Sequence, residues 1–309
     1  MSDMSGNVCV VTGASSGIGK VTARRLAEKG ASVVLVCRNR EKGEAAAEEI
    51  KRSTGNENLK LEFRDLSSQR EVIALAREVR CTYPKIDVLI NNAAKFPAGF
   101  QETEDGIEST FALNHLAPFF LSILLLEPLS RAHTGEGNTE SASSERRIIT
   151  VSSVAQKAGT VKWGDLEHRE GEFKPWPVYA QSKLLNVIFT KELARRLKDP
   201  KTKGPAVTAN CLHPGTVYTD IFREFNPIRK LASRFISVGP EKGADNSVYV
   251  ATSPEVRGLS GCYFVKRKPA EVNPEAEDPE AGKRLWEKSL EMTVERHRNE
   301  IEDLLPEGL

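Results

Sequence analysis

The sequence predicts an α/β fold in which a doubly wound parallel sheet lies between two layers of helices. Three observations support this fold class. Short runs rich in valine and isoleucine alternate with longer helical patterns along the chain. The runs are continuously apolar, which is typical of strands buried on both faces of a parallel sheet. No linker or internal repeat interrupts the alternation, so we expect one domain over residues 1–309.

Seven strands and the helices between them can be assigned in order. Each expected strand is an apolar run bounded by turn-forming residues, and the strands cover 8–13, 31–38, 59–66, 86–94, 146–153, 206–215 and 261–265. The intervening segments have helical patterns, and the expected helices cover 18–29, 41–53, 68–80, 105–130 and 179–198. The apolar run at 116–129 contains Glu127 and two prolines and is too short to span a membrane, so it predicts a buried core helix.

Two segments depart from this pattern. The stretch 132–145 is small and polar and is predicted to be a surface loop before the fifth strand. After residue 265 the composition turns to proline and glutamate, and an amphipathic helix follows with apolar residues at 281, 285 and 292. We therefore expect residues 266–309 to form a C-terminal extension that contains a helix.

Composition narrows the function class. Hydrophobic residues make up 39% and charged residues 28%, while the net charge is only +1, which gives no reason to expect a nucleic-acid partner. Five cysteines without CxxC spacing indicate reduced thiols, and the five histidines form no pair or cluster, so no metal site is expected. The N-terminus shows no signal-peptide pattern, which predicts a cytoplasmic protein and leaves peripheral contact with a membrane open.

A glycine-rich turn follows the first strand. In "TGASSGIG" (12–19), Gly13, Gly17 and Gly19 are spaced G-x-x-x-G-x-G rather than G-x-G-x-x-G. Glycines at such a turn allow backbone N–H groups to approach a pyrophosphate at a helix N-terminus. A glycine cluster alone is a weak signal, but its position between a strand and a helix at the chain start strengthens it.

A tyrosine and a lysine stand four residues apart in "VYAQSKLLNV" (178–187). On a helix, Tyr179 and Lys183 lie on one face within reach of a common point. Taken alone, the pair has a plain structural interpretation, with the tyrosine packed and the lysine in solvent. Other motifs must decide between this interpretation and a functional one.

Six motifs follow one another along the chain in an order that is typical of one enzyme family: "TGASSGIG", "NNAA" (91–94), "ALNH" (112–115), "VSS" (151–153), "YAQSK" (179–183) and "HPGTV" (213–217). With them the chain resembles the short-chain dehydrogenases/reductases over about residues 7–265. "VCRNREKGEAAAEEI", "LLNVIFTKELARRLK" and "KRLWEKS" are similar to the retinol dehydrogenase branch in particular. The resemblance implies a single-domain Rossmann fold with a seven-stranded parallel sheet. Ala94 departs from the family, which usually has glycine after "NNA".

The resemblance also implies a catalytic group of Asn114, Ser153, Tyr179 and Lys183. Ser152 is the alternative to Ser153 as the catalytic serine. A free phenol has a pKa of ~10, and we expect the lysine ammonium to lower it so that the tyrosine acts as acid and base. The serine would hydrogen-bond the substrate oxygen as charge develops. The asparagine would hold a water that relays protons to the lysine, although by itself it could equally make a structural hydrogen bond.

The expected cofactor is NADP(H). An NAD site of this fold usually has Asp or Glu about 20 residues past the glycines, whereas Arg38 stands there and can bind a 2′-phosphate. Asp65 is expected at the adenine ring, with a helix N-cap as its alternative. The predicted cofactor-binding residues are Gly13, Ser15, Ser16, Gly17, Ile18, Gly19, Arg38, Asp65, Leu66, Asn92, Ala93, Tyr179, Lys183, Pro214, Gly215, Val217 and Thr219.

Together these features predict an NADP(H)-dependent oxidoreductase that acts on a small-molecule alcohol or carbonyl, with an apolar substrate such as a retinoid or another lipid-like aldehyde or ketone. The segment 216–239 alternates aromatic and basic residues and is expected to form a substrate lid, with membrane contact or an ordinary packed helix pair as alternatives. A non-catalytic dinucleotide-binding regulatory or scaffold protein is the competing function, and homo-oligomerisation stays open.

Overall fold

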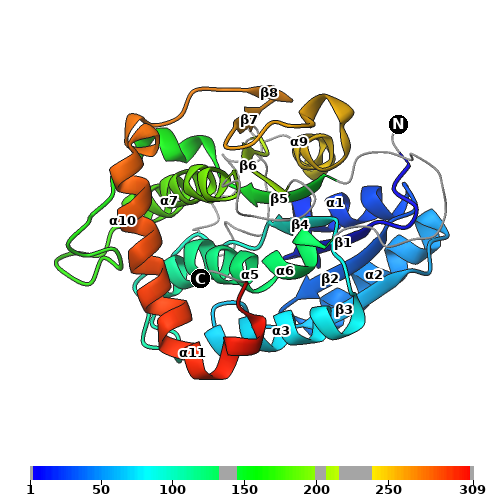
Figure 1. Ribbon diagram of the computed structural model, residues 1–309, viewed down its shortest axis with the longest axis horizontal. Coiled ribbons are helices and arrows are strands. Elements are labelled where there is room, and N and C mark those ends of the chain that lie inside the picture. The colour runs from blue at the N-terminus through cyan, green and yellow to red at the C-terminus, as the bar shows by residue number, and fades with distance from the viewer. Residues whose placement is uncertain (1–2, 132–144, 199–206, 216–238, 307–309) are drawn as a thin grey trace.

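The computed structural model describes residues 3–131, 145–198, 207–215 and 239–306. Its centre is one eight-stranded sheet with the order β3-β2-β1-β4-β5-β6-β7-β8 (Figure 1). The strands are β1 Val8–Thr12, β2 Ser32–Cys37, β3 Leu59–Phe63, β4 Val88–Asn91, β5 Arg146–Val151, β6 Val207–His213, β7 Tyr263–Val265 and β8 Lys268–Pro269. The first seven are parallel, which confirms the predicted doubly wound class.

The strand count exceeds the prediction by one. β8 pairs antiparallel with β7 across a tight turn in which Lys266 and Arg267 both have positive φ, 49° and 65°. Glycine or asparagine usually marks such a turn because other side chains are strained there. Neither residue type is present at these two positions, so the sequence carried no hairpin signal.

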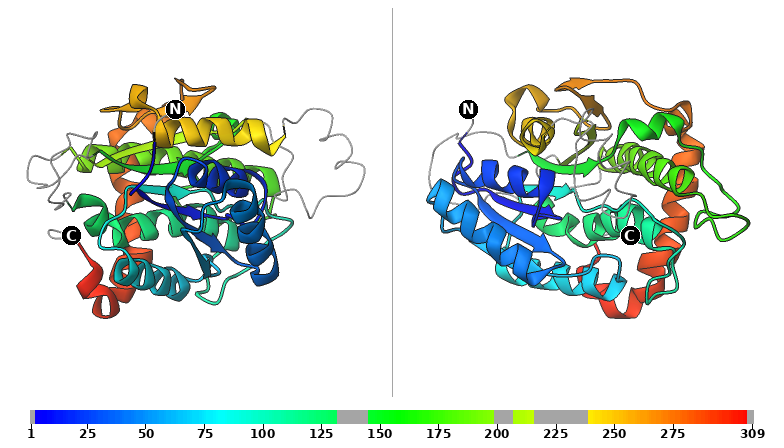
Figure 2. Two further views of the ribbon diagram at one scale, coloured as in Figure 1. Left: turned by 90° about the vertical axis from the view of Figure 1, so that its right-hand side faces the viewer. Right: turned by 180° about the vertical axis from the view of Figure 1, so that it is seen from behind.

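Helices cover both faces of the sheet (Figures 1 and 2). One apolar core packs α1, α2 and α9 against one face, and the other packs α3, α5, α7 and α10 against the opposite face. Successive β1 residues alternate between the two cores, with Val10 in one and Cys9 and Val11 in the other. Their bounds are α1 Gly17–Ala27, α2 Arg40–Thr54, α3 Gln69–Thr82, α5 Ala117–Leu124, α7 Pro175–Arg196, α9 Pro240–Thr252 and α10 Pro279–Leu290.

The helix expected at 105–130 is not continuous. It begins with a short α4 (Ser109–Phe111), passes through a π-helical turn η1 (Ala112–Leu116) into α5, and ends with α6 (Leu126–Ser130). The Pro/Glu-rich stretch and the amphipathic pattern at the C-terminus give η5 (Pro274–Glu277), α10, a second π turn η6 (Glu291–Glu295), α11 (Arg296–Ile301) and η7 (Glu302–Leu304). The sequence analysis missed α9. Two predicted segments lie outside the described residues. They are the polar loop at 132–145, except for residue 145, and the lid at 216–239, except for residue 239.

The order of the strands locates a binding site. The chain runs outward from β1 to β2 and β3, then crosses to β4 on the other side of β1. In open α/β sheets, ligands bind at the carboxyl ends of the strands where the order reverses in this way. The turn after β1 and the segment after β4 therefore frame the expected cleft. None of the helices in the described ranges has the length and apolarity needed to cross a bilayer.

Candidate active site

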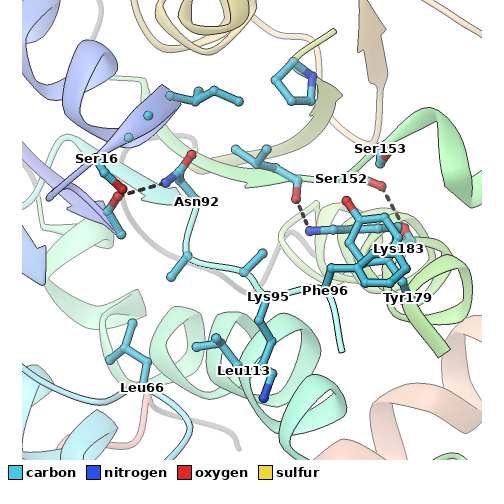
Figure 3. A pocket seen from close by; sticks show the side chains of 18 of the residues that line it. Ser16, Leu66, Asn92, Lys95, Phe96, Leu113, Ser152, Ser153, Tyr179 and Lys183 are labelled. Carbon is cyan, nitrogen blue, oxygen red and sulfur yellow. Dashed lines mark hydrogen bonds between the residues drawn. The ribbon is translucent and has the colours of Figure 1, made fainter. Parts of the chain in front are cut away.

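A cleft of about 510 Å³ opens at the carboxyl edge of the sheet. It extends from the end of β2, across the turn after β1 and the end of β4, to the ends of β5 and β6 and the start of α7. Figure 3 shows side chains from these elements turned toward a common space. Most of the predicted site residues meet here, although they are far apart in the sequence.

The glycine turn forms the floor of the cleft. Gly13 and Gly17 have φ of 68° and 55°, a region that favours glycine. A side chain on Gly19 would overlap the carbonyl oxygen of Gly13, so this position also requires glycine. Ser16 is the N-cap residue of α1, yet its side chain makes no capping hydrogen bond. The N-terminus of α1 thus keeps backbone donors for an anion.

Asn92 joins this turn to β4. Its Nδ2 donates to the carbonyl of Thr12 at 2.8 Å, and the backbone N–H groups of Asn92 and Ala93 donate to Thr12 Oγ1 at 2.9 and 3.0 Å. These bonds hold the ends of two neighbouring strands in register. These hydrogen bonds therefore fix the position of the turn that forms the floor of the cleft.

Basic side chains surround one end of the cleft. Arg38, Lys42 and Arg64 all line it. The Arg38 side chain is 71% exposed and its Nη1 is 3.8 Å from Asp65 Oδ2, a loose contact that leaves its donors largely available. Lys42 lies on the first turn of α2 and was not predicted from the sequence.

Asp65 does not cap the helix that follows it. Its Oδ1 accepts hydrogen bonds from the backbone N–H and the hydroxyl of Ser67, at 3.0 and 2.7 Å. The N-cap residue of α3 is Ser68, whose side chain accepts from the N–H of Glu71. The alternative interpretation of Asp65 as the N-cap was therefore wrong, and its carboxylate faces the basic end of the cleft.

Tyr179 stands at the other end of the cleft, in the second turn of α7. Its ring centroid is 5.0 Å from that of Phe96 and 6.4 Å from that of Trp176, so aromatic neighbours fix its orientation. The residue is 8% exposed. Burial raises the pKa of its phenol to about 12, while a hydrogen bond with Ser153 acts in the opposite direction.

Lys183 lies one turn further along α7 and is buried. Its Nζ donates to the carbonyl of Val151 at 3.1 Å and is 5.6 Å from the Tyr179 ring centroid. Burial lowers the pKa of its ammonium to about 7. The expectation that this ammonium lowers the tyrosine pKa was wrong, because the pKa of the phenol is raised and burial is the main cause.

The two serines after β5 have different surroundings. The Ser152 hydroxyl is buried and donates to the carbonyl of Lys183 at 2.7 Å. The Ser153 hydroxyl faces the cleft, accepts from the N–H of Ala155 at 3.2 Å and bonds with Tyr179. Ser153 therefore has the hydroxyl that can meet a substrate, and Ser152 ties the end of β5 to α7.

Asn114 is fully buried in the π turn η1 and does not line the cleft. Its Oδ1 accepts from the N–H of Lys95 at 2.8 Å, and its Nδ2 donates to the Lys95 carbonyl and to Ser182 Oγ at 2.9 and 3.0 Å. These bonds fix the segment after β4 against α7. The water relay to Lys183 stays a prediction.

The remaining predicted residues divide clearly. The cleft is lined by Gly13, Ser15, Ser16, Gly17, Ile18, Gly19, Arg38, Asp65, Leu66, Asn92, Ala93, Pro214 and Gly215. Val217 and Thr219 lie outside the described residues. The sequence analysis missed the apolar lining of Phe96, Leu113, Val154 and Trp176. Trp176 precedes Tyr179 by three residues, and this helical spacing is the signal that could have identified it.

His213 also lines the cleft and was not singled out. Its Nδ1 accepts the backbone N–H of Val154 at 3.2 Å, and burial lowers its pKa to about 4. The ring is therefore neutral at physiological pH. It holds the end of β6 to the segment that carries Ser153.

Known proteins are similar to this chain over most of its length. The family model described as short chain dehydrogenase matches residues 7–230. Human retinol dehydrogenase 14 is 38% identical over 303 residues, which cover 92% of this chain and 85% of that protein, and human retinol dehydrogenase 11 is 39% identical over 290 residues, 93% and 86% of the two chains.

Solved structures share the fold. An uncharacterised protein from Mycobacterium paratuberculosis superimposes with a TM-score of 0.74 at 30% identity, covering 94% of this chain and 95% of that one. A short-chain dehydrogenase from Shigella flexneri, solved with NADP, has a TM-score of 0.61 at 22% identity and covers 84% of this chain and 97% of its own.

Proposed function

The chain belongs to the short-chain dehydrogenase family of oxidoreductases, and from this premise we propose that it is an NADP(H)-dependent enzyme that interconverts an alcohol and a carbonyl on an apolar substrate. The observation that carries the proposal is the convergence of Ser153, Tyr179 and Lys183 at one end of a cleft whose other end is basic. When bound, NADP(H) supplies or accepts the hydride.

The cleft fits this cofactor. An uncapped helix N-terminus beside Gly13, Gly17 and Gly19 suits a pyrophosphate. Arg38 and Lys42 suit a 2′-phosphate, because a guanidinium and an ammonium can donate hydrogen bonds to it. The 2′-hydroxyl of NAD(H) is instead usually bound by a carboxylate, which accepts its hydrogen bond. Asp65 lies near Arg38 and Leu66 beside it, where an adenine could rest. Ser15, Ser16 and Asn92 would complete the contacts along the floor.

The chain's own groups handle the proton. Because the pKa of Tyr179 is raised to about 12, its phenol is protonated at neutral pH and can donate to a carbonyl oxygen during reduction. The Ser153 hydroxyl would hydrogen-bond the same oxygen as negative charge develops on it. Lys183, with its pKa near 7, can take up or release a proton at physiological pH. Burial around both groups excludes water from the reacting oxygen.

The substrate class follows from the walls near Tyr179. Phe96 and Trp176 pack against Tyr179, Leu113 and Val154 also line the cleft, and Val154 and Trp176 are 51% and 53% exposed. Exposed large apolar side chains that gather at one opening are typical of a binding site. The similar human proteins are named retinol dehydrogenases. A retinoid or another lipid-like aldehyde or ketone is the substrate we propose.

The test is a substrate panel with purified protein. Oxidation of NADPH and of NADH is followed with retinal, a long-chain aldehyde, a ketone and a small aldehyde. We expect turnover with NADPH and a higher kcat/KM for the long apolar carbonyls. Cofactor binding without turnover on any carbonyl would instead favour a non-catalytic dinucleotide-binding protein. The proposal also includes a cytoplasmic location with peripheral membrane contact, homo-oligomerisation and a substrate lid at 216–239.

A further inference from the structure

His115 follows Asn114 in the "ALNH" motif, and the proposed chemistry leaves it without a role. It is fully buried, and burial lowers its pKa to about 3, so the imidazole is neutral. Its Nε2 lies 2.9 Å from Ser289 Oγ, which belongs to α10 in the C-terminal extension. The Ser289 hydroxyl also lies 2.8 Å from the carbonyl of Leu285, to which it can donate, and Asn186 is a second side-chain partner of the imidazole.

This contact joins two segments that are 174 residues apart in the sequence. Aromatic rings surround it: Phe119 lies 5.5 Å from Phe189 and 5.1 Å from Trp286, and the His115 ring is 6.3 Å from Phe189. Figure 1 shows α10 running beside α7 and α5. The extension is thereby built into the core that supports the active site, and is not a loose tail.

His115 and Asn114 share an unusual backbone. Both lie in the π turn η1, in which the N–H of Ala117 bonds to the carbonyl of Ala112, five residues back. A π turn is less favourable than α-helix and appears mostly where function or surrounding contacts require it. Here the side chains of neighbouring residues hold it from two directions, Asn114 toward Lys95 and Ser182, and His115 toward Ser289.

We propose that the His115–Ser289 hydrogen bond positions Asn114 for catalysis, so that the C-terminal extension controls the geometry of the active site from behind. His115 and Ser289 are positioning residues, because neither lines the cleft. Without this bond the π turn loses one of its two anchors. Asn114 and the segment that it holds, Lys95 with the adjoining Phe96, then shift relative to Tyr179. The inference rests on the proposed function.

The first test compares two hydroxyl deletions in the extension. Ser289→Ala removes the contact with His115, whereas Thr293→Val removes a buried hydroxyl that donates to the carbonyl of Ser289 within the same helical segment. We expect Ser289→Ala to lower kcat about tenfold, since small misplacements of catalytic groups have effects of this size. The KM for NADPH should change less than about twofold. Thr293→Val should lose similar stability and keep kcat.

A double-mutant cycle asks whether the effect passes through Asn114. If the bond acts by positioning this residue, Ser289→Ala should cost little further activity in an Asn114→Ala background. Independent, multiplying losses would contradict the positioning role. A second pair of variants checks which ring nitrogen makes the contact with Ser289. His115→Gln places an amide nitrogen about where Nε2 lies and should retain activity, whereas His115→Asn places it about where Nδ1 lies and should not.

Hydrogen–deuterium exchange of the peptide 109–118 gives a readout that needs no turnover. Exchange in the cofactor-free protein should be faster in Ser289→Ala than in the wild type and in Thr293→Val. Equal exchange and equal kcat in Ser289→Ala and Thr293→Val would overturn the inference while leaving the proposed function intact. If the wild type turned over no carbonyl, the proposed function would be wrong. The exchange comparison would then be the test of whether the His115–Ser289 contact holds the π turn.

Discussion

Burial is the main cause of the pKa shifts of Tyr179 and Lys183. A tyrosine and a lysine one turn apart on a helix invite the argument that the ammonium stabilises the phenolate. In the structure both groups have lost most of their hydration, so the tyrosine pKa rises to about 12 and the lysine pKa falls to about 7. Each shift favours the neutral form. At neutral pH Tyr179 is therefore a neutral phenol, and Lys183 is close to half protonated.

This environment predicts how stability depends on pH. The pKa of Lys183 is 10.5 in an ordinary setting and about 7 in the fold, so between these values the unfolded chain binds more protons. Lowering the pH through this window destabilises the folded state, and the full cost, on the order of 3–5 kcal/mol, is present below pH 7. Lys183→Met removes the charge and should stabilise the cofactor-free protein.

Urea unfolding of wild type and Lys183→Met at several pH values measures this effect. The stability gain of the variant should be largest near pH 6.5 and should shrink as the pH approaches 10.5. Lys191→Met provides the control, because Lys191 lies on the same helix but reaches solvent and pairs with Glu277 at 3.0 Å. Parallel curves for wild type and Lys183→Met would show that the ammonium is hydrated, and the burial argument would fail.

Cofactor choice is also decided by single residues. Arg38→Asp removes a donor to the 2′-phosphate and adds a like charge. Charge-assisted hydrogen bonds contribute about 1.5–3 kcal/mol, so NADPH affinity should fall roughly 10- to 100-fold. Arg40→Asp makes the same charge change two residues away, where the guanidinium packs over Phe63 at 4.1 Å and does not line the cleft.

Fluorescence titration with NADPH and NADH measures both dissociation constants. We expect Arg38→Asp to weaken NADPH and to bind NADH no worse than wild type, while Arg40→Asp changes NADPH affinity only slightly. A wild type that prefers NADH, or equal losses in the two variants, would refute the assignment of Arg38 to the 2′-phosphate.

At the scale of elements, the glycine turn joins β1 to α1 with no spare room. Gly19→Ala puts a methyl group against the Gly13 carbonyl and the Asn92 amide. Overpacking of this kind costs about 1–3 kcal/mol, and here it also displaces the floor of the cleft. We expect a lower melting temperature and weaker NADPH binding. Gly164→Ala, where a methyl meets nothing within 4 Å, should alter neither property. Unchanged binding in Gly19→Ala would argue against a phosphate cradle at this turn.

Elements with strong periodicity could be predicted from the sequence, and irregular ones could not. Most of the parallel strands, such as β1 and β2, are apolar on both faces, and their sequence shows this directly. The π turn at 112–116 depends on contacts with Lys95, Ser182 and Ser289, which come from three distant segments. Local sequence carries no record of such contacts. The β7–β8 hairpin was missed because lysine and arginine occupy its positive-φ positions.

At the scale of the whole molecule, the strand order explains why motifs scattered over 200 residues meet in one cleft. Segments after β1, β4, β5 and β6 emerge at one edge of the parallel sheet, and α7 crosses beside them. Motif order could therefore predict most of the polar site. The apolar wall could not be predicted in the same way, since Val154 and Trp176 resemble ordinary core residues until their exposure is known.

Tyr179→Phe tests whether Tyr179 transfers a proton during hydride transfer. The variant keeps the ring between Phe96 and Trp176 and removes only the hydroxyl. NADPH oxidation with the best carbonyl of the panel and NADPH affinity are measured on wild type and variant together. General acid catalysis contributes about 10²- to 10⁴-fold, so kcat should fall at least about 100-fold while the Kd for NADPH stays within about twofold. Retention of more than about 10% of kcat, with binding unchanged, would contradict the account.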